Sequence, residues 1–373
     1  MKVVLLLSRI ELSGVTTHTL TLAEGLIEEG HEVLLITGGI VRTEDESISE
    51  AYSQFRAKAI AIKEFKTPNG NLFGKAILSI ISILQIIRWI NSFKPQVIHC
   101  QSPYMTFIPW MMNKHFTTTM HQVDLIKNFK FKNPTHLIAI SQESLDFSKN
   151  EFNIKEESAS IIHHGISKRF ATPITIEEKN QLKQKYNIPN NKLVIGYAGS
   201  ISRRKGHDIL IEAIKNLNPE SLEKIHLVFL GGSTKTDPFA WLQQLVLKAA
   251  IDKYTSCIPF EDPKPFYDIF DIFVLPSRME SFPLVTIEAM MSGCCVLRSN
   301  TEGSYEQIDH GTNGLLFENE NHQQLTSLLT KVINENNTRK ELGANAKQKA
   351  LEDFTIPVMA RKTIAVYEKC RLY

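Results

Sequence analysis

The stretch that decides the fold is PSRMESFPLVTIE, residues 276–288. An apolar run, Ile269–Leu275, precedes it and is typical of a buried strand. The apolar segment Leu284–Ser292 follows and predicts a helix that ends at Gly293. Cys294–Ser299 is then apolar enough for the next strand. A strand, a loop, a helix and a second strand in this order are the repeating unit of a parallel sheet, which predicts an α/β fold.

The same alternation extends in both directions from this unit. Toward the centre of the chain, strands are expected at Lys192–Ala198 and Ile225–Leu230, with a helix near 207–216. In the first half, helices are expected at 15–29 and 76–92, and strands at Lys2–Leu7, Glu32–Thr37, Gln96–Cys100, Phe116–Met120 and His136–Ile140. Two doubly wound βα layers of similar size are therefore predicted. The polar stretch Ser167–Asn191 is the expected linker, which places one domain at 1–168 and a second at 169–353.

The helix at 76–92 has polar residues at every third position from 79 to 91. We interpret them as one narrow wet stripe on an otherwise buried helix. The apolar stretch Ala76–Ile90 falls short of the roughly 20 residues that a membrane-spanning helix needs. The opening run Val3–Leu7 is also too short for the apolar part of a secretion signal, so a soluble or membrane-attached protein is expected.

Composition excludes several classes of protein. The 373 residues are 43% hydrophobic and 22% charged, the mix of a globular protein rather than a disordered one. Lys plus Arg (42) nearly balances Asp plus Glu (40), so bulk attraction to nucleic acid is not expected. The five cysteines are odd in number and form no C-x-x-C pair, which argues against a disulfide framework and a zinc cage. A reducing cytoplasm is the simplest location.

Ligands of open parallel sheets bind beyond the carboxyl ends of the strands, so the loops there matter most. Glu280 lies in the loop after a predicted strand, and Glu288 lies about one turn inside the following helix. Free backbone amides at the start of that helix suit a phosphate, while the two carboxylates suit sugar hydroxyls. Taken alone, Glu280 is better explained as a partner of the helix dipole, and Glu288 as an exposed helical residue.

Two further loops of this kind stand out. Residues 199–206 carry three consecutive cations between glycines, a suitable cradle for a diphosphate, although a solvated basic loop has the same composition. The cations are Arg203, Arg204 and Lys205. In the first domain, Gly14 precedes a helix and could let backbone amides approach an anion, although a glycine there is more often only part of a turn.

With these motifs the chain resembles the retaining GT-B glycosyltransferases of the family-four type. The E-x7-E spacing is matched by Glu280 and Glu288. The sequence that follows Glu288, through Glu302-Gly303 to residues 309–314, matches the family pattern, as do residues 94–99 and 163–166. The resemblance covers essentially the whole chain. It implies two Rossmann-like domains facing a central cleft, with a C-terminal helix, residues 354–373, that packs back on the first domain.

The resemblance also implies the role of each site residue. Catalysis would involve His121 beside the reacting sugar, Glu280 on the sugar hydroxyls and Lys205 on the diphosphate. Glu288 would bind the ribose of the nucleotide, and Gly14 would let the first domain touch the phosphates. The remaining contacts to the donor are assigned to Ser200, Arg203, Arg204, Ile258, Phe260, Ser281, Phe282, Pro283, Leu284 and Val285.

The chain departs from the family pattern at two positions. Ser200 stands where the family often has an arginine, and Arg203 or Arg204 is the candidate to replace that charge. The common Gly-Phe-Gly is Ser281-Phe282-Pro283 here, and Pro283 has no N–H to offer the donor sugar but fits the first position of a helix. A change of donor is the expected result.

The resemblance implies transfer of a sugar from a nucleotide-diphosphate sugar to a hydroxyl, with retention and without metal or other cofactor. No D-x-D motif is present, and an arginine, Lys205 and a helix dipole would take the role of Mg²⁺. The acceptor is expected to be a glycan or glycolipid of the cell envelope. A GT-B-fold epimerase or hydrolase, and a non-catalytic sugar-nucleotide-binding subunit, remain as alternatives.

Contact with the cytoplasmic face of a membrane is a further expectation. The segment Lys127–Lys132 interleaves cations with aromatic residues, and Phe107, Trp110, Met111 and Met112 are nearby in sequence. Such a patch suits an anionic lipid surface, but a solvated basic loop beside core aromatic residues fits equally well.

Overall fold

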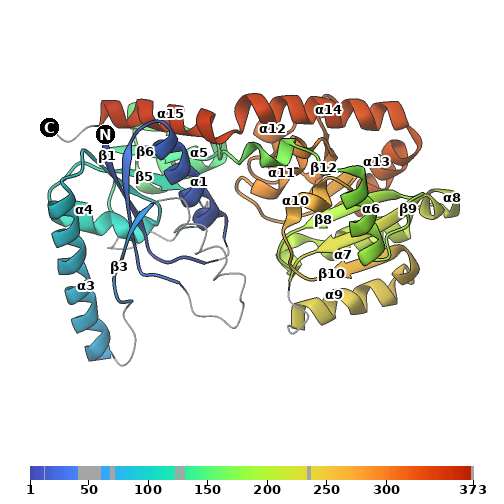
Figure 1. The fold of residues 1–373 in the computed structure, drawn as a ribbon, viewed down its shortest axis with the longest axis horizontal. Coiled ribbons are helices and arrows are strands. Elements are labelled where there is room, and N and C mark those ends of the chain that lie inside the picture. Colours follow the sequence, from blue (N-terminus) through green and yellow to red (C-terminus); the bar gives the residue numbers. More distant parts are fainter. Residues whose placement is uncertain are drawn as a thin grey trace. The chain divides into compact units, whose positions relative to one another are not determined.

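The computed structural model describes residues 1–11, 13–40, 60–67, 72–121, 125, 131–232 and 237–370. The chain forms two compact units, one of residues 1–166 with 355–373, and one of residues 167–354. Each unit is an α/β layer built around a parallel sheet (Figure 1).

The sheet of the first unit has the strand order β3-β2-β1-β4-β5-β6-β7 among the described residues. All its pairings are parallel, and β1 lies in the middle, with Lys2 beside Glu32 on one side and Val3 beside Val97 on the other. The strands are β1 (Lys2–Leu7), β2 (Glu32–Thr37), β3 (Ala61–Glu64), β4 (Val97–Cys100), β5 (Thr117–Met120), β6 (His136–Ala139) and β7 (Ala159–Ile161). The helices are α1 (Gly14–Glu28), α3 (Leu72–Phe93), α4 (Phe107–Met111), α5 (Gln142–Phe152) and α15 (Ile356–Lys369), with short 3-10 turns at Pro103–Thr106 and Glu156–Ser158.

The C-terminal helix α15 is part of the first unit, although the chain reaches it only after completing the second. It packs against α1, and Tyr367 is fully buried in the same core cluster as the apolar side chains of β1 (Figure 1). The Tyr367 hydroxyl lies 2.6 Å from His99 Nδ1 on β4, which ties the helix to the sheet.

The second unit has the strand order β10-β9-β8-β11-β12-β13, again with parallel pairings. Its strands are β8 (Leu193–Ala198), β9 (Ile225–Leu230), β10 (Thr255–Ile258), β11 (Ile272–Leu275), β12 (Cys295–Ser299) and β13 (Leu315–Phe317). Its α-helices are α6 (Ile176–Lys185), α7 (His207–Lys215), α8 (Pro219–Glu223), α9 (Asp237–Lys248), α10 (Pro263–Tyr267), α11 (Leu284–Ser292), α12 (Ser304–Gln307), α13 (His322–Asn334) and α14 (Asn336–Asp353). Short 3-10 turns lie at Lys168–Ala171, Arg203–Lys205 and Asp252–Tyr254.

Most elements predicted from the sequence are present, and the strands at Lys2–Leu7, Glu32–Thr37 and Ile225–Leu230 have the expected bounds. The expected linker at 167–191 contains α6, a polar helix whose start is fixed by reciprocal hydrogen bonds between Thr175 and Glu178. A polar sequence therefore does not exclude a helix where the local capping residues favour one.

The interpretation of α3 as a buried helix with one wet stripe is wrong. Ser82, one of the polar positions, is buried, and its hydroxyl donates to the Lys66 carbonyl at 2.7 Å. Ile80 and Leu84, assigned to the buried part, are exposed. Three residues turn an α-helix by less than a full circle, so side chains at every third position drift around its surface instead of forming one stripe.

Candidate functional site: the carboxyl edges of the two sheets

The loops that follow β8 and β11 meet at the carboxyl edge of the second sheet. Gly206 ends the first of them with a φ of 70°, and a Cβ there would lie 1.9 Å from the carbonyl oxygen of Pro276 in the second. Only glycine allows this approach. The backbone N–H of Arg278 also donates to the Arg204 carbonyl at 2.8 Å, so the two loops form one structure.

The joined loops bring Lys205 and Glu280 together. The Lys205 ammonium pairs with Glu280 Oε1, and the two side chains are only 13% and 8% exposed. The residues are 75 positions apart in sequence. A carboxylate removed from water needs a partner of this kind, because an unpaired buried charge is strongly destabilising. The contact places a fixed cation and a fixed hydrogen-bond acceptor at the sheet edge where ligands of such folds bind.

Arg278 holds the two loops in place, and the sequence analysis did not identify it. Its guanidinium pairs with both carboxylate oxygens of Asp208, at 2.9 and 2.8 Å, and donates to the Arg203 carbonyl at 2.6 Å. Burial by itself raises the pKa of Asp208, but the hydrogen bonds and charge of Arg278 outweigh it and lower the pKa. The signal in the sequence was an arginine two residues before the first glutamate of the E-x7-E motif.

The cations of the first loop differ in their surroundings. Arg203 and Arg204 are both exposed, and the Arg204 guanidinium donates to the Met279 carbonyl at 3.2 Å. Ser200 is also exposed, and its carbonyl accepts a hydrogen bond from the Tyr197 hydroxyl at 3.0 Å. Lys205 is therefore the loop cation that packs against Glu280, and Arg203 and Arg204 face solvent.

The segment between the two glutamates turns into α11. Phe282 is buried against the ring of Phe354, with centroids 5.6 Å apart in an edge-to-face arrangement. Pro283 caps the helix with a φ of −67°, one position before the first helical residue at which it was expected. Its carbonyl accepts from Gln307 Nε2 at 3.1 Å. The other residues assigned to this segment are half-buried: Ser281, Leu284 and Val285.

A buried arginine supports this segment from the next strand. Arg298 on β12 is fully buried and donates to Gln307 Oε1 and, at 3.0 Å, to Thr301 Oγ1. It also reaches the carbonyl of Gly303, where a Cβ would lie 2.2 Å from the Ser281 carbonyl oxygen. Arg298 thus fixes the loop that packs against Ser281. The sequence analysis took Arg298 only as part of an apolar strand, and a cation inside that run was the available signal.

Glu288 lies in α11, where its Oε2 accepts a hydrogen bond from the Tyr267 hydroxyl at 3.0 Å. Burial raises the pKa of Glu288 to about 7, although the Tyr267 hydrogen bond and the charge of Arg169 act in the opposite direction. The exposed surface glutamate considered as an alternative is therefore not what the structure shows.

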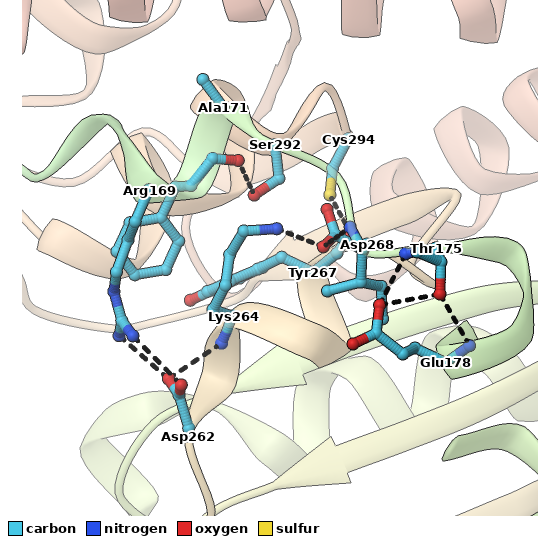
Figure 2. Close-up of polar contacts among 12 residues, drawn as sticks. Arg169, Ala171, Thr175, Glu178, Asp262, Lys264, Tyr267, Asp268, Ser292 and Cys294 are labelled. Atoms are coloured by element: carbon cyan, nitrogen blue, oxygen red, sulfur yellow. Dashed lines mark hydrogen bonds and ion pairs between the residues drawn. The ribbon is translucent and has the colours of Figure 1, made fainter. Parts of the chain in front are cut away.

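The polar contacts around α10 form the neighbourhood of Tyr267 (Figure 2). The Arg169 guanidinium donates two hydrogen bonds to the carboxylate oxygens of Asp262, at 3.1 and 2.9 Å. Lys264 pairs with Asp268, and both side chains are almost fully buried. These pairs fix both ends of α10, which packs against α11.

Ile258 and Phe260 are assigned to the nucleotide base; Ile258 is the last residue of β10, and Phe260 follows that strand at the same edge. The Ile258 carbonyl accepts from the Gly231 N–H at 3.0 Å, and the Phe260 N–H donates to the Gly232 carbonyl at 2.8 Å. These backbone groups therefore bond to the loop after β9. The Phe260 side chain is half exposed.

In the first unit, His121 directly follows β5 and lies in a cluster of buried histidines. Its ring is 4.9 Å from that of His18 on α1 and 5.5 Å from that of His164, which follows β7. His18 Nδ1 and His164 Nδ1 are 2.8 Å apart, so one of them carries the shared proton. Burial, followed by the neighbouring imidazoles, lowers the pKa of all three well below the ordinary value. The cluster is neutral at pH 7.

The protonation of His121 follows from its partner. Its Nε2 lies 3.2 Å from Gln101 Oε1, an oxygen that can only accept, so Nε2 carries the hydrogen. His121 Nδ1 is then a lone-pair acceptor, and it is buried without a hydrogen-bond partner among the described residues. His121 was predicted from the sequence, but Gln101, which directly follows β4, was not, and His164 was noted only as part of the family pattern at residues 163–166.

Gly14 is the first residue of α1, and a Cβ there would meet nothing within 4 Å. The role assigned to Gly14 at the donor phosphates stays a prediction. Of the basic and aromatic segment, Lys127–Lys130 lies outside the described residues, whereas Lys132 is described and its ammonium lies 4.3 Å from the Trp110 ring centroid. In the described part of the chain, no group of three or more His, Cys, Asp or Glu residues could hold a metal ion.

Two family profiles match the chain in succession. The profile described as Glycosyltransferase Family 4 matches residues 12–170, and the one described as Glycosyl transferases group 1 matches residues 178–349. An uncharacterized glycosyltransferase of Methanocaldococcus jannaschii is 24% identical over 95% of this chain and 94% of its own length. The capsular polysaccharide biosynthesis glycosyltransferase CapM of Staphylococcus aureus is 24% identical over 77% of this chain and 80% of its own.

Solved structures show the same fold over nearly the full length. A glycosyltransferase from Rickettsia africae superimposes with a TM-score of 0.83 at 20% identity, covering 99% of this chain and 98% of its own. HepE of Anabaena, solved in complex with UDP and glucose, gives a TM-score of 0.82 at 16% identity, covering 99% of both chains. Since the two profiles span both units and the fold is that of GT-B glycosyltransferases, the chain belongs to the group 1, family 4 glycosyltransferases.

Proposed function

We propose that this glycosyltransferase moves a sugar from a nucleotide-diphosphate sugar to a hydroxyl of a glycan or lipid-linked acceptor, with retention and without a divalent ion. The observation that carries the proposal is the Lys205–Glu280 contact. It joins a cation suited to a diphosphate to a carboxylate suited to sugar hydroxyls, at the carboxyl edge of a parallel sheet.

The main electrostatic task is to stabilise the diphosphate as the anomeric C–O bond breaks. Lys205 is fixed by Glu280, so its charge needs no reorganisation when negative charge develops on the leaving group. The exposed guanidinium of Arg203 and the free amides at the start of α11 add positive potential on the same sheet edge. Together these groups supply the charge that Mg²⁺ supplies in metal-dependent enzymes.

Glu280 and Glu288 take different parts of the donor. Glu280 accepts hydrogen bonds from the sugar hydroxyls, and its contact with Lys205 holds the carboxylate in place. Glu288 takes the ribose hydroxyls, and its Tyr267 hydrogen bond orients the carboxyl group. Arg298 acts as a positioning residue, because it holds the loop that packs against Ser281, next to Glu280.

In the first unit, His121 is the candidate to contact the reacting sugar. Its unpartnered Nδ1 accepts a hydrogen bond from a sugar hydroxyl, and a ligand that supplies the donor satisfies this buried atom. A neutral imidazole is suited to this task, since a cation there would oppose an oxocarbenium-like transition state.

For the retaining step we propose attack from the face that the diphosphate leaves. The bond between the anomeric carbon and the diphosphate oxygen breaks, and the acceptor oxygen forms its bond on the same face. The acceptor proton passes to an oxygen of the departing diphosphate. Closure around the donor would exclude water and limit hydrolysis.

The donor and acceptor classes follow from the comparisons and remain part of the proposal. HepE of Anabaena binds UDP and UDP-glucose, and WaaG, another structural neighbour, is involved in lipopolysaccharide biosynthesis. CapM is named for capsular polysaccharide biosynthesis. We therefore propose a UDP-sugar donor and an envelope glycan or glycolipid acceptor, with the reaction at the cytoplasmic face of a membrane.

A panel of nucleotide sugars tests the proposal. The true donor, at about 100 times its dissociation constant, should raise the stability of the protein by roughly 2.7 kcal/mol in a thermal-shift assay. The product formed with that donor should have the anomeric configuration of the donor by NMR, with EDTA present or absent. An inverted product would contradict the retaining step. Conversion of the donor without an acceptor would favour an epimerase or hydrolase instead.

A further inference from the structure

We propose that an apolar surface of α3 and α4 binds the first unit to an anionic membrane surface. The proposal rests on the membrane location given in the proposed function and names the surface that reaches the membrane. On α3, the side chains of Ile77, Ile80, Ile81 and Leu84 are between 43% and 62% exposed. Their spacing of three, one and three residues places them on one face of the helix.

The fold does not account for this face. Farther along α3, Ile86 and Ile90 are buried in a core cluster, so the helix is held by its C-terminal half. The segment Gly74–Phe93 has the length and hydropathy of a membrane-crossing helix, yet only 17% of its most apolar part is buried. This corrects the expectation that the apolar stretch is too short to span. An aliphatic stripe open to water is costly unless something covers it.

The topology decides how α3 can meet a membrane. The helix connects β3 to β4, which are parallel strands of one sheet, and its second half packs on that sheet. Both ends of α3 therefore stay on the same side of a bilayer. The helix lies on the lipid surface and does not cross it, as interfacial helices do.

The short helix α4 packs on the same core cluster as the C-terminal half of α3 and adds exposed apolar side chains of its own. Its Ile108 belongs to the same core cluster as Ile86 and Ile90 of α3, so the two helices share one face of the unit (Figure 1). Trp110 and Met111 on α4 are about half exposed, and the Lys132 ammonium lies over the Trp110 ring. Tryptophan and a neighbouring lysine are suited to the headgroup region, where an aromatic ring meets both lipid and water.

The charged residues around α3 and α4 indicate that the membrane surface is anionic. The chain has 40 acidic residues, yet none lies between Glu64 and Asp124, the stretch that includes α3 and α4. The same stretch carries Lys66, Lys75, Arg88, Lys94 and Lys114. A segment with basic and no acidic residues around an aliphatic stripe complements anionic lipid headgroups, which would repel acidic side chains. The stripe itself has no side-chain hydrogen-bonding groups, unlike the polar rim typical of protein interfaces.

Vesicle binding tests the proposal with two matched double variants. The full-length protein is mixed with phosphatidylcholine vesicles that contain or lack phosphatidylglycerol, and bound protein is measured by sedimentation. The wild type should bind the anionic vesicles more tightly, and added salt should weaken binding. Ile80→Gln with Leu84→Gln should lower the partition coefficient at least about tenfold. The control pair, Ile176→Gln with Leu247→Gln, changes exposed aliphatic residues of the second unit and should bind as the wild type does.

Several results would overturn the proposal. These are the absence of wild-type binding to anionic vesicles, equal binding by the α3 variant and the wild type, and an equal loss in the control variant. A concentration-dependent dimer that the α3 variant abolishes would also overturn it, in favour of a second copy of the chain. The assay contains no donor sugar, so its result is independent of whether the proposed sugar transfer is correct. A thermal midpoint equal to that of the wild type shows that each variant is folded.

Discussion

The two units carry different side chains at the carboxyl edges of their parallel sheets. In the second unit, the loops after the parallel strands hold a buried Lys205–Glu280 ion pair and an arginine-rich rim. In the first unit, the corresponding edge holds neutral imidazoles, with His121 against Gln101. Both sheets provide an edge where strand ends and helix starts converge, and the side chains decide whether that edge is charged or neutral.

This difference suits the two halves of an activated sugar. A diphosphate needs fixed positive charge, whereas a sugar carbon that gains positive charge needs neutral acceptors close to it. If the division holds, variants of the charged edge should act on donor binding and turnover, and variants of the histidine edge should act through pH and sugar contacts.

The largest expected effect is a loss of turnover when the ion pair at the charged edge is removed. Glu280→Gln and Lys205→Met should each lower turnover about 10²–10³-fold, since each removes a fixed group beside the developing charge. Initial rates with the donor found in the thermal-shift panel measure this. Glu212→Gln, in an exposed ion pair with Lys215 on α7, is the matched control and should keep its turnover. Normal turnover in both Glu280→Gln and Lys205→Met would remove the basis of the proposed function.

The next effect is on stability. Arg298→Met should lower the free energy of unfolding by about 2–3 kcal/mol, because it leaves buried oxygens of Gln307 and Thr301 without a donor. Urea unfolding followed by circular dichroism measures it. Arg361→Met, on the exposed face of α15, should cost less than about 0.5 kcal/mol. A similar loss in the two variants would mean that Arg298 does not support the loop.

The histidine edge should respond to acid. The pKa of His164 is lowered in the folded protein, so the unfolded chain binds more protons once the pH falls below about 6.5. Folding stability should then decrease by about 1.4 kcal/mol per pH unit for each such histidine. Burial lowers the pKa of His99 to about 3, so for this residue the decrease in folding stability continues down to about pH 3. His164→Asn should reduce the slope of thermal midpoint against pH, and the exposed His115→Asn should not.

The pH effect at Glu288 has the opposite sign to that at the histidines. Burial raises the pKa of Glu288 to about 7, so the folded protein binds the extra proton between about pH 4.5 and 7. Its contribution to stability is lost as the pH rises through this window. Glu288→Gln should raise the thermal midpoint relative to the wild type at pH 8, and less at pH 5. The exposed Glu177→Gln should show no such difference, and a parallel response of both variants would contradict the raised pKa.

The sequence by itself determined the α/β class and most strand positions, because buried parallel strands appear as short apolar runs that need no knowledge of their neighbours. It also pointed to His121, Lys205, Glu280 and Glu288, although their roles rest on family resemblance and stay predictions. The spacing of polar residues in α3 predicted the wrong exposed face, because the exposure of a helix depends on which of its sides the rest of the fold covers.

Only the tertiary structure decided which groups meet. The contact between Lys205 and Glu280, the burial of Arg298, and the gathering of His18, His121 and His164 join segments far apart in the chain. No local pattern encodes these contacts, because strand order and loop approach set them. The protonation of Glu288 is decided in the same way, since a carboxyl group has its ordinary pKa until the fold removes it from water.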